Sequence, residues 1–264
     1  MAAVIQSLTS RGIVVQPNCS TSDAAVIWSV LWHGRMLANQ AVYTHYRSLG
    51  RPVIIAEVGA LRRSHTWKIS VNHVNNQGYY GHTTDLDCAR PQKLGIALQQ
   101  NNGYNSSILI AAQHSASLQL HGVDQEQWIT QMIQTIRQHT DRPIVVRPHP
   151  RHRLNWNKLP ADVVRQLTKP IADSYDSYDL DTRYHAIVNY NSGPGTLAGI
   201  AGSRPLVHQS SLAAEVGISV DNIEQPYLID RQAWLVKMCH TEYTVSEIAS
   251  GHWIDRLTQA LTQT

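Results

Sequence analysis

The sequence contains no phenylalanine, and its large aromatic side chains are seven tryptophans and eleven tyrosines. The core must therefore be built mainly of valine, isoleucine, leucine and alanine. Charged residues are also scarce, at 16% of 264 residues, whereas hydrophobic residues make up 42%. This balance argues against an intrinsically disordered chain and allows one large domain or two lobes of modest size.

Cysteine is scarce too, with only Cys19, Cys88 and Cys239, and no two of them form a CxxC pair. An odd and widely spaced set argues against a disulfide framework or a zinc site and fits a reducing cytoplasm. The first twelve residues lack the pattern of a signal peptide, and no apolar run approaches the ~20 residues that span a bilayer. We therefore expect a cytoplasmic protein without a membrane partner.

Strong charge of either sign is absent as well, because the formal net charge is only +3 with the 14 histidines counted as neutral. A weak positive field suits an anionic ligand. It also tolerates DNA, but it falls short of the basic surface of a dedicated nucleic-acid binder.

Short apolar runs alternate with amphipathic segments along the chain, which is typical of an α/β fold with parallel strands. In the first half, strands are predicted at 24–31 and 52–56 around a helix at 36–49, whereas 62–92 has no clear pattern. The second half predicts strands at 108–112, 143–146, 186–190 and 205–208, and helices at 124–139, from Leu197 and at 247–261.

A polar stretch at 99–107 (QQNNGYNSS) is the predicted linker. We therefore predict an N-terminal lobe at 1–102, a C-terminal lobe at 103–240 and a C-terminal helical segment at 241–264 that packs back on the lobes.

The strongest local signal is the segment 191–198 (NSGPGTLA), which lies between a predicted strand and a predicted helix. Gly193 and Gly195 permit backbone angles that other residues resist. The hydroxyls of Ser192 and Thr196, with free N–H groups, can hold a phosphate at the positive end of a helix dipole. The alternative is a capped strand-to-helix turn that binds nothing.

The second signal is the segment 147–152 (RPHPRH), directly after a predicted strand. Arg147 can bind a phosphate with two parallel hydrogen bonds, and His149 can donate a hydrogen bond to a leaving diphosphate or protonate it. A basic surface turn is the alternative, and a metal site at His149 and His152 lacks a third nearby ligand. Because a third strand ends at Gln113, we expect these segments to meet at one edge of the sheet.

Four segments of the second half carry a family pattern: ILIAAQ, TDRPIVVRPHPR, VNYNSGPGTLAGIAGSRPLV and EYTVSEIASGHWIDRL. They resemble glycosyltransferases of the GT-B architecture, especially capsular-polysaccharide transferases and similar enzymes encoded by bacteriophages. The phage-like resemblance extends across VIIAEVGALRRSHTWKISVN in the first half. It implies two Rossmann-like α/β lobes that face each other across a cleft.

The same resemblance implies the roles of individual residues. In the capsule and polysialyl enzymes, a His-Pro motif and a serine-containing motif bind the nucleotide, and they match His149 and Ser192. The resemblance also places a ribose-binding carboxylate in the region of Glu215. We thus expect a donor site of Arg147, His149, Ser192, Gly193, Gly195, Thr196 and Glu215, which takes a UDP-, GDP- or CMP-linked sugar.

In GT-B enzymes the acceptor lobe supplies any catalytic base, and the best-placed carboxylate is Glu57, at the end of a predicted strand. Asp23 and His33, which flank the first predicted strand, are the other candidates. The alternative for Glu57 is a structural ion pair with Arg62 or Arg63. A retaining enzyme would have no such base.

Arg62, Arg63, Trp67 and Lys68 are predicted to line an acceptor groove, because aromatic and basic residues together suit DNA and also a glycan. The alternative is a core tryptophan with a basic rim. The run at 176–181 (DSYDLD) resembles a loose metal loop but lacks the glycine and the distal glutamate of a calcium site, so a solvated acidic loop is expected. We predict no metal and no tightly bound cofactor.

These observations lead to one main hypothesis and two alternatives. The main one is transfer of a sugar to a hydroxymethylated pyrimidine in phage DNA, in the host cytoplasm, with the target base flipped out of the duplex. The first alternative is a capsule or wall polymer transferase acting on a glycan or a polyol phosphate, although the basic amphipathic helix of membrane-surface enzymes is missing. The second is a nucleotide-binding protein without catalysis. No obligate protein partner is expected.

Overall fold

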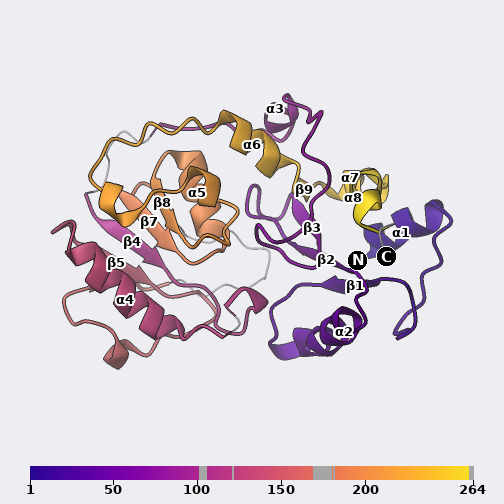
Figure 1. Cartoon of the computed structure of the whole chain (residues 1–264), viewed down its shortest axis with the longest axis horizontal. Coiled ribbons are helices and arrows are strands. Elements are labelled where there is room, and N and C mark those ends of the chain that lie inside the picture. Colours follow the sequence, from indigo (N-terminus) through magenta and orange to yellow (C-terminus); the bar gives the residue numbers. More distant parts are fainter. Residues whose placement is uncertain (101–105, 121, 169–179, 181, 262–264) are drawn as a thin grey trace. The chain divides into compact units, whose positions relative to one another are not determined.

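The computed structural model describes residues 1–100, 106–120, 122–168, 180 and 182–261. The centre of the predicted linker and the acidic run at 176–181, apart from Leu180, lie outside the described residues. The chain divides into two compact units (Figure 1): unit 1 comprises Met1–Leu94 and Val236–Thr264, and unit 2 comprises Gly95–Leu235.

Unit 1 contains a four-stranded sheet with the order β1-β2-β3-β9. Its elements are α1 (Ala2–Ser10), β1 (Ala25–Trp28), α2 (Leu37–Ser48), β2 (Val53–Val58), β3 (Trp67–Val71), α3 (Arg90–Lys93), β9 (Glu242–Tyr243), α7 (Val245–Ala249) and α8 (His252–Leu261). The helix α6 (Gln232–Cys239) crosses the boundary between the units.

The sheet of unit 1 is mixed, which corrects the expectation of a Rossmann-like sheet in the first lobe. β1 and β2 are parallel, but β2 pairs antiparallel with β3, and β3 pairs antiparallel with β9. The loop 59–66 between β2 and β3 is too short for the crossover that parallel strands require. β3 falls in the segment for which the sequence showed no clear pattern.

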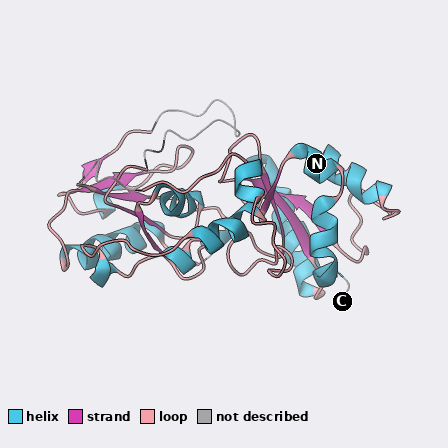
Figure 2. Cartoon of the chain, turned by 90° about the horizontal axis from the view of Figure 1, so that it is seen from above, coloured by secondary structure: helices cyan, strands magenta, loops and turns pink. Residues whose placement is uncertain are grey.

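The core of unit 1 joins the two ends of the chain. Val4 and Leu8 of α1 pack with Trp253 and Leu257 of α8 against the apolar side of β2, β3 and β9. The indole Nε1 of Trp253 donates to Ser7 Oγ at 3.1 Å. α2 contacts β1 and β2, so the strands lie among helices (Figure 2).

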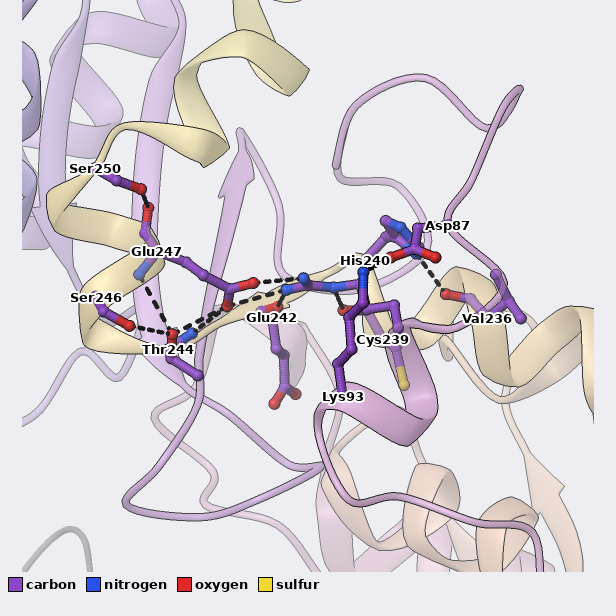
Figure 3. A network of polar contacts seen from close by, with 11 residues as sticks. Asp87, Lys93, Val236, Cys239, His240, Glu242, Thr244, Ser246, Glu247 and Ser250 are labelled. Carbon is purple, nitrogen blue, oxygen red and sulfur yellow. Dashed lines mark hydrogen bonds and ion pairs between the residues drawn. The ribbon is translucent and has the colours of Figure 1, made fainter.

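Buried charge attaches the C-terminal segment to the rest of unit 1. The guanidinium of Arg90 donates to the Glu247 carboxylate at 2.5 and 3.2 Å and to the backbone oxygens of Cys239 and Glu242. Glu247 also completes a capping box with Thr244 at the start of α7 (Figure 3).

Unit 2 is a parallel α/β layer with the strand order β6-β5-β4-β7-β8. Its elements are β4 (Ile108–Ala111), α4 (Gln125–Arg137), β5 (Ile144–Arg147), β6 (Val164–Arg165), β7 (Ala186–Asn189), α5 (Gly193–Ala201) and β8 (Arg204–Val207). By sequence the order is third, second, first, fourth, fifth, which is that of a Rossmann sheet without its sixth strand. Its topological switch point lies between β4 and β7.

Two helices cover the two faces of this sheet. α4 begins at Asp124, whose side chain accepts from Gln127 N, and its Ile129, Ile133 and Ile136 pack on one face. Ala198 of α5 packs against Leu109, Ala111 and Ile187 on the other. Within the described part of the chain, no helix combines the length and apolarity needed to cross a bilayer.

Candidate functional site

The carboxyl edge of the unit 2 sheet gathers polar residues from four strands. Gln113 and His114 follow β4, Arg147 ends β5, Asn191 follows β7, and His208 follows β8. All except His208 are buried, at 4–6% exposure. Ligands of open parallel sheets bind at this edge, beside the switch point.

Amide side chains connect the loops on the two sides of the switch point. Gln113 Nε2 donates to Asn191 Oδ1 at 3.1 Å, and Asn191 N donates to Gln113 Oε1 at 3.2 Å. Asn189 Nδ2 donates to the backbone oxygen of Ala111 at 2.8 Å. The β4 and β7 ends are therefore fixed to each other by buried hydrogen bonds.

Three histidines lie together next to this network. The ring of His114 lies 5.4 Å from that of His149 and 5.1 Å from that of His152. His149 Nδ1 accepts from Arg151 N at 3.1 Å, and His114 Nδ1 accepts from Ala116 N at 3.2 Å. With Nδ1 occupied as an acceptor, each neutral ring carries its proton on Nε2.

The surroundings of His149, which is predicted to bind the nucleotide, favour its neutral form. Burial, followed by the nearby His114, Arg151, His152 and Arg147, lowers the pKa of His149 to about 3. A neutral imidazole donates one hydrogen bond but has no extra proton to deliver. Of the two predicted roles, the structure favours donation over protonation.

The segment 192–196 differs from the predicted loop. The helix α5 begins at Gly193 rather than at Leu197, and neither Gly193 nor Gly195 has a positive φ. The need for glycine at Gly195 is steric, because a Cβ there would lie 2.7 Å from Val207 Cγ1 on β8. Close helix–strand packing, rather than an unusual backbone angle, requires that glycine.

Ser192 is the N-cap residue of α5, but its side chain does not cap the helix. Its Oγ instead contacts Asn189, and Ser192 N donates to Asn189 Oδ1 at 2.7 Å. Thr196 is buried in the first turns of α5, and Glu215 is exposed in a short 3-10 helix after β8. The nine-residue helix α5 thus starts without a side-chain cap at the edge that holds the histidines.

In unit 1, Glu57 is held at the carboxyl end of β2. Its Oε2 accepts from Ser29 Oγ at 2.8 Å and from Val30 N at 3.2 Å, and its Oε1 accepts from Val58 N at 2.9 Å. Ser29, with φ of 67°, turns the chain after β1 toward this carboxylate. These partners, rather than the Arg62 or Arg63 of the alternative interpretation, hold the carboxylate.

The two other candidate bases lie apart from each other. β1 and β2 are parallel, with Ala25 opposite Val53 and Trp28 opposite Ala56. His33 follows the carboxyl end of β1, so it lies toward the same sheet edge as Glu57, and it is exposed. Asp23 precedes β1 and lies at the opposite edge. The structure therefore does not bring Asp23 to Glu57.

The four predicted acceptor residues do not form one groove. Successive strand residues point to opposite faces, and Trp67 packs on the apolar cluster whereas Lys68 lies opposite Glu57 and Glu242. Arg62 and Trp67 line a cavity of about 370 Å³ within unit 1. Its other polar lining residues are Ser64, His65, Thr66, Lys93, Thr244 and Ser246.

Lys68 lies between two carboxylates on its own face of the sheet. Burial lowers the pKa of Lys68, and the charges of Glu242 and Glu57 oppose that shift. Glu242 is itself buried and accepts from Ala60 N at 2.7 Å and from Thr66 Oγ1 at 2.7 Å.

Sequence reasoning missed Asn189, His208 and Ser210 in unit 2 and Glu242 in unit 1, and it gave Asn191 no role of its own. The available signal was position, since Asn189 ends a buried strand and the other unit 2 residues lie in the loops that follow one. Across the described residues, no three histidine, cysteine or acidic side chains are arranged to hold a metal ion.

No protein-family model matches the chain, and no curated protein sequence matches it. Among solved structures it is similar to Thermosulfurimonas dismutans KpsC, beta Kdo 2,4 transferase, with a TM-score of 0.50 and 14% identity over 92% of this chain and 90% of that chain. Thermosulfurimonas dismutans KpsC, beta Kdo 2,7 transferase, gives a TM-score of 0.47 at 12% identity over 96% and 88%. The first likeness establishes a shared mixed α/β fold along most of both chains.

Proposed function

We propose that the chain is a glycosyltransferase that moves a sugar from a nucleotide-sugar donor to an acceptor hydroxyl. The observation that carries this proposal is the carboxyl edge of the unit 2 sheet. There an arginine, three histidines and the start of α5 flank the switch point of a sheet with a Rossmann-like strand order. The fold shared with KpsC, a Kdo transferase by name, supports sugar transfer.

On the donor side, the diphosphate or phosphate would bind near the N-terminus of α5, where the helix dipole favours negative charge. Arg147 would provide a cation with a fork of N–H donors. His149 would donate its Nε2 proton in a hydrogen bond to the leaving phosphate oxygen and so stabilise charge as the bond to the sugar breaks.

On the acceptor side, Glu57 would remove the proton of the attacking hydroxyl. The hydrogen bonds from Ser29 and from two backbone N–H groups fix the orientation of its carboxylate. A fixed carboxylate is what a positioned general base requires. This role applies to an inverting reaction.

The acceptor is the open part of the proposal. A hydroxymethylated pyrimidine in DNA and a saccharide or polyol phosphate both present a hydroxyl, and the cavity beside Trp67 offers cations and hydroxyl groups for either. Both acceptor classes therefore enter the test.

The test begins with a thermal-shift panel of UDP, GDP, CMP, ADP and the corresponding sugar nucleotides. A ligand at ~100 times its dissociation constant adds about 2.7 kcal/mol of stability. We expect a shift with one nucleotide that is lost in Arg147→Ala. The sugar nucleotide that corresponds to this nucleotide is then incubated with the protein and with hydroxymethylated DNA or oligosaccharides.

Absence of a shift with every nucleotide would contradict the donor site. Nucleotide binding without turnover on any acceptor would instead support a nucleotide-binding protein without catalysis.

A further inference from the structure

The side-chain amide of Asn191 contacts the loops that follow two other strands. Its Nδ2 donates to the backbone oxygen of Gln119 at 3.2 Å and to Ser210 Oγ at 2.9 Å. Its Oδ1 accepts from Gln113 Nε2 at 3.1 Å. Because Gln113 and Gln119 follow β4 and Ser210 follows β8, this one side chain joins the loops of three strands.

This amide is not available to a ligand. Asn191 is 5% exposed and Gln113 is 4% exposed, and both the amide nitrogen and the amide oxygen of Asn191 have protein partners. Asn191 directly precedes Ser192 and the start of α5, and Gln113 directly precedes His114. The pair therefore fixes the start of α5 relative to the histidine-bearing loop.

The contacts of Asn191 continue to His208. Ser210 Oγ, which accepts from Asn191, lies 2.8 Å from His208 Nδ1, and Ser210 N donates to the same Nδ1 at 3.2 Å. Because the backbone N–H of Ser210 donates to Nδ1, that nitrogen is unprotonated and the imidazole proton is on Nε2. The Ser210 hydroxyl therefore also donates to Nδ1 while its oxygen accepts from Asn191. The His208 ring also stacks on Tyr190 with centroids 4.4 Å apart.

We propose that Asn191 is a positioning residue of the donor site, which sets the place of the α5 N-terminus and, through the Ser210 hydroxyl, a hydrogen bond to His208 Nδ1. The proposal rests on the proposed function, in which α5 receives the donor phosphate. Burial lowers the pKa of His208, so the neutral ring that accepts from Ser210 is the form present at neutral pH.

The variant Asn191→Asp tests the proposal with almost no change in shape. It replaces the Nδ2 donor by an acceptor, so the Ser210 hydroxyl turns to the new carboxylate and leaves His208 Nδ1. The matched control is Asn222→Asp, where the amide is exposed and Nδ2 donates only to Ser219 Oγ at 3.1 Å. Ser210→Ala is a second variant that removes the relay at a half-buried position and keeps the bond to Gln119.

Two measurements are made on the full chain. Histidine NMR, assigned with His208→Gln, reports the hydrogen bonding of the His208 ring nitrogens without any substrate. Kinetics with the donor found by the nucleotide panel report kcat and KM. They are measured well below the melting temperature of each variant. We expect Asn191→Asp to change the His208 signals and to lower kcat/KM roughly ten-fold or more, as expected when a supporting contact of a site is lost.

The proposal is overturned if Asn191→Asp leaves the His208 signals as in the wild type. If Asn191→Asp does not fold, Ser210→Ala is judged by the same criterion. It is also overturned if kcat/KM falls no further than in Asn222→Asp, since a residue that serves stability alone would lower only the melting temperature. A wild-type chain that binds no nucleotide contradicts the proposed function, and the NMR comparison still decides whether the relay exists.

Discussion

At the scale of single residues, the thiol of Cys19 has an unusual setting. Hydrogen bonds, first from Ser22 and then from Thr21, lower the pKa of Cys19 to about 7. Burial, in contrast, raises the pKa of Cys239 to about 12. Reactivity follows the thiolate, so Cys19 and Cys239 differ sharply in how they react at neutral pH.

We predict that the alkylation rate of Cys19 in the folded protein reaches half its maximum near pH 7, whereas Cys239 does not react. Site-resolved mass spectrometry after pulses of iodoacetamide across a pH series measures both rates. The exposed Cys88 is the internal comparison. A Cys19 rate that still rises steeply above pH 8.5 would show that its neighbours do not stabilise the thiolate.

Arg90 is the second residue whose removal has a defined consequence. Its side chain is 6% exposed and that of Glu247 is 27% exposed. Arg90→Met leaves this carboxylate and two backbone oxygens without their partner, so we predict a loss of about 3 kcal/mol in the free energy of unfolding by urea. Arg11→Met, which removes the exposed pair with Asp255, is the control and should have a much smaller effect.

The loss caused by Arg90→Met should also depend on pH. Burial by itself would raise the pKa of Glu247, but the bonds from Arg90 and Thr244 lower it overall. A carboxyl with a lowered pKa stabilises the fold above its unfolded pKa of about 4.3, and this contribution is lost as the pH falls through its folded pKa. The difference between Arg90→Met and wild type should therefore be larger at pH 7 than at pH 3, and a difference independent of pH would contradict the assigned ion pair.

At the scale of elements, the contact between α5 and β8 depends on Gly195. A Cβ at this position would lie 2.7 Å from Val207 Cγ1, which is closer than real Cβ atoms approach. The Val207 side chain or the helix must then shift, and a shift of the helix moves the N-terminus of α5.

We predict that Gly195→Ala destabilises the protein by about 1–3 kcal/mol and that Val207→Ala relieves much of this loss in the double variant. Chemical denaturation of the two single variants and the double variant gives the coupling energy. Simple additivity would show that the contact is not what makes glycine necessary at this position.

At the scale of the whole molecule, the two ends of the chain share one core. Trp253 is fully buried, belongs to the cluster that contains Val4 and Leu8, and is 246 residues from Ser7, to which it donates. Unit 2 has its own cluster around Ile108 and Ile110. Damage to the first cluster should therefore affect unit 1 first.

We predict that Trp253→Ala lowers stability by about 3–5 kcal/mol and speeds amide hydrogen exchange in α1 and β3 more than in β4. Exchange read by mass spectrometry distinguishes the units, and His252→Ala, an exposed position on the same helix, is the control. Equal acceleration in β3 and β4 would show that the units unfold as one.

Local sequence was sufficient for elements that local chemistry specifies. The apolar runs near Ile108, Ile144, Ala186 and Pro205 became the parallel strands of unit 2, because strands buried on both faces must be apolar throughout. The side chain of Asp124 marked the start of α4. That polar residues after these strands would share one edge also followed, since parallel strands end on the same side.

Tertiary structure decided what depends on partners distant in the sequence. β3 was hidden because basic residues precede it and because one of its two partners, β9, lies far along the chain. Trp67 and Lys68 are neighbours in sequence, but pleating sends them to opposite faces of the sheet. The amide of Asn191 became informative only when folding placed Gln113 and Ser210 beside it. A sequence by itself determines which side chains are available and which local elements they favour, whereas contacts across 19 to 78 residues exist only after the strands have paired.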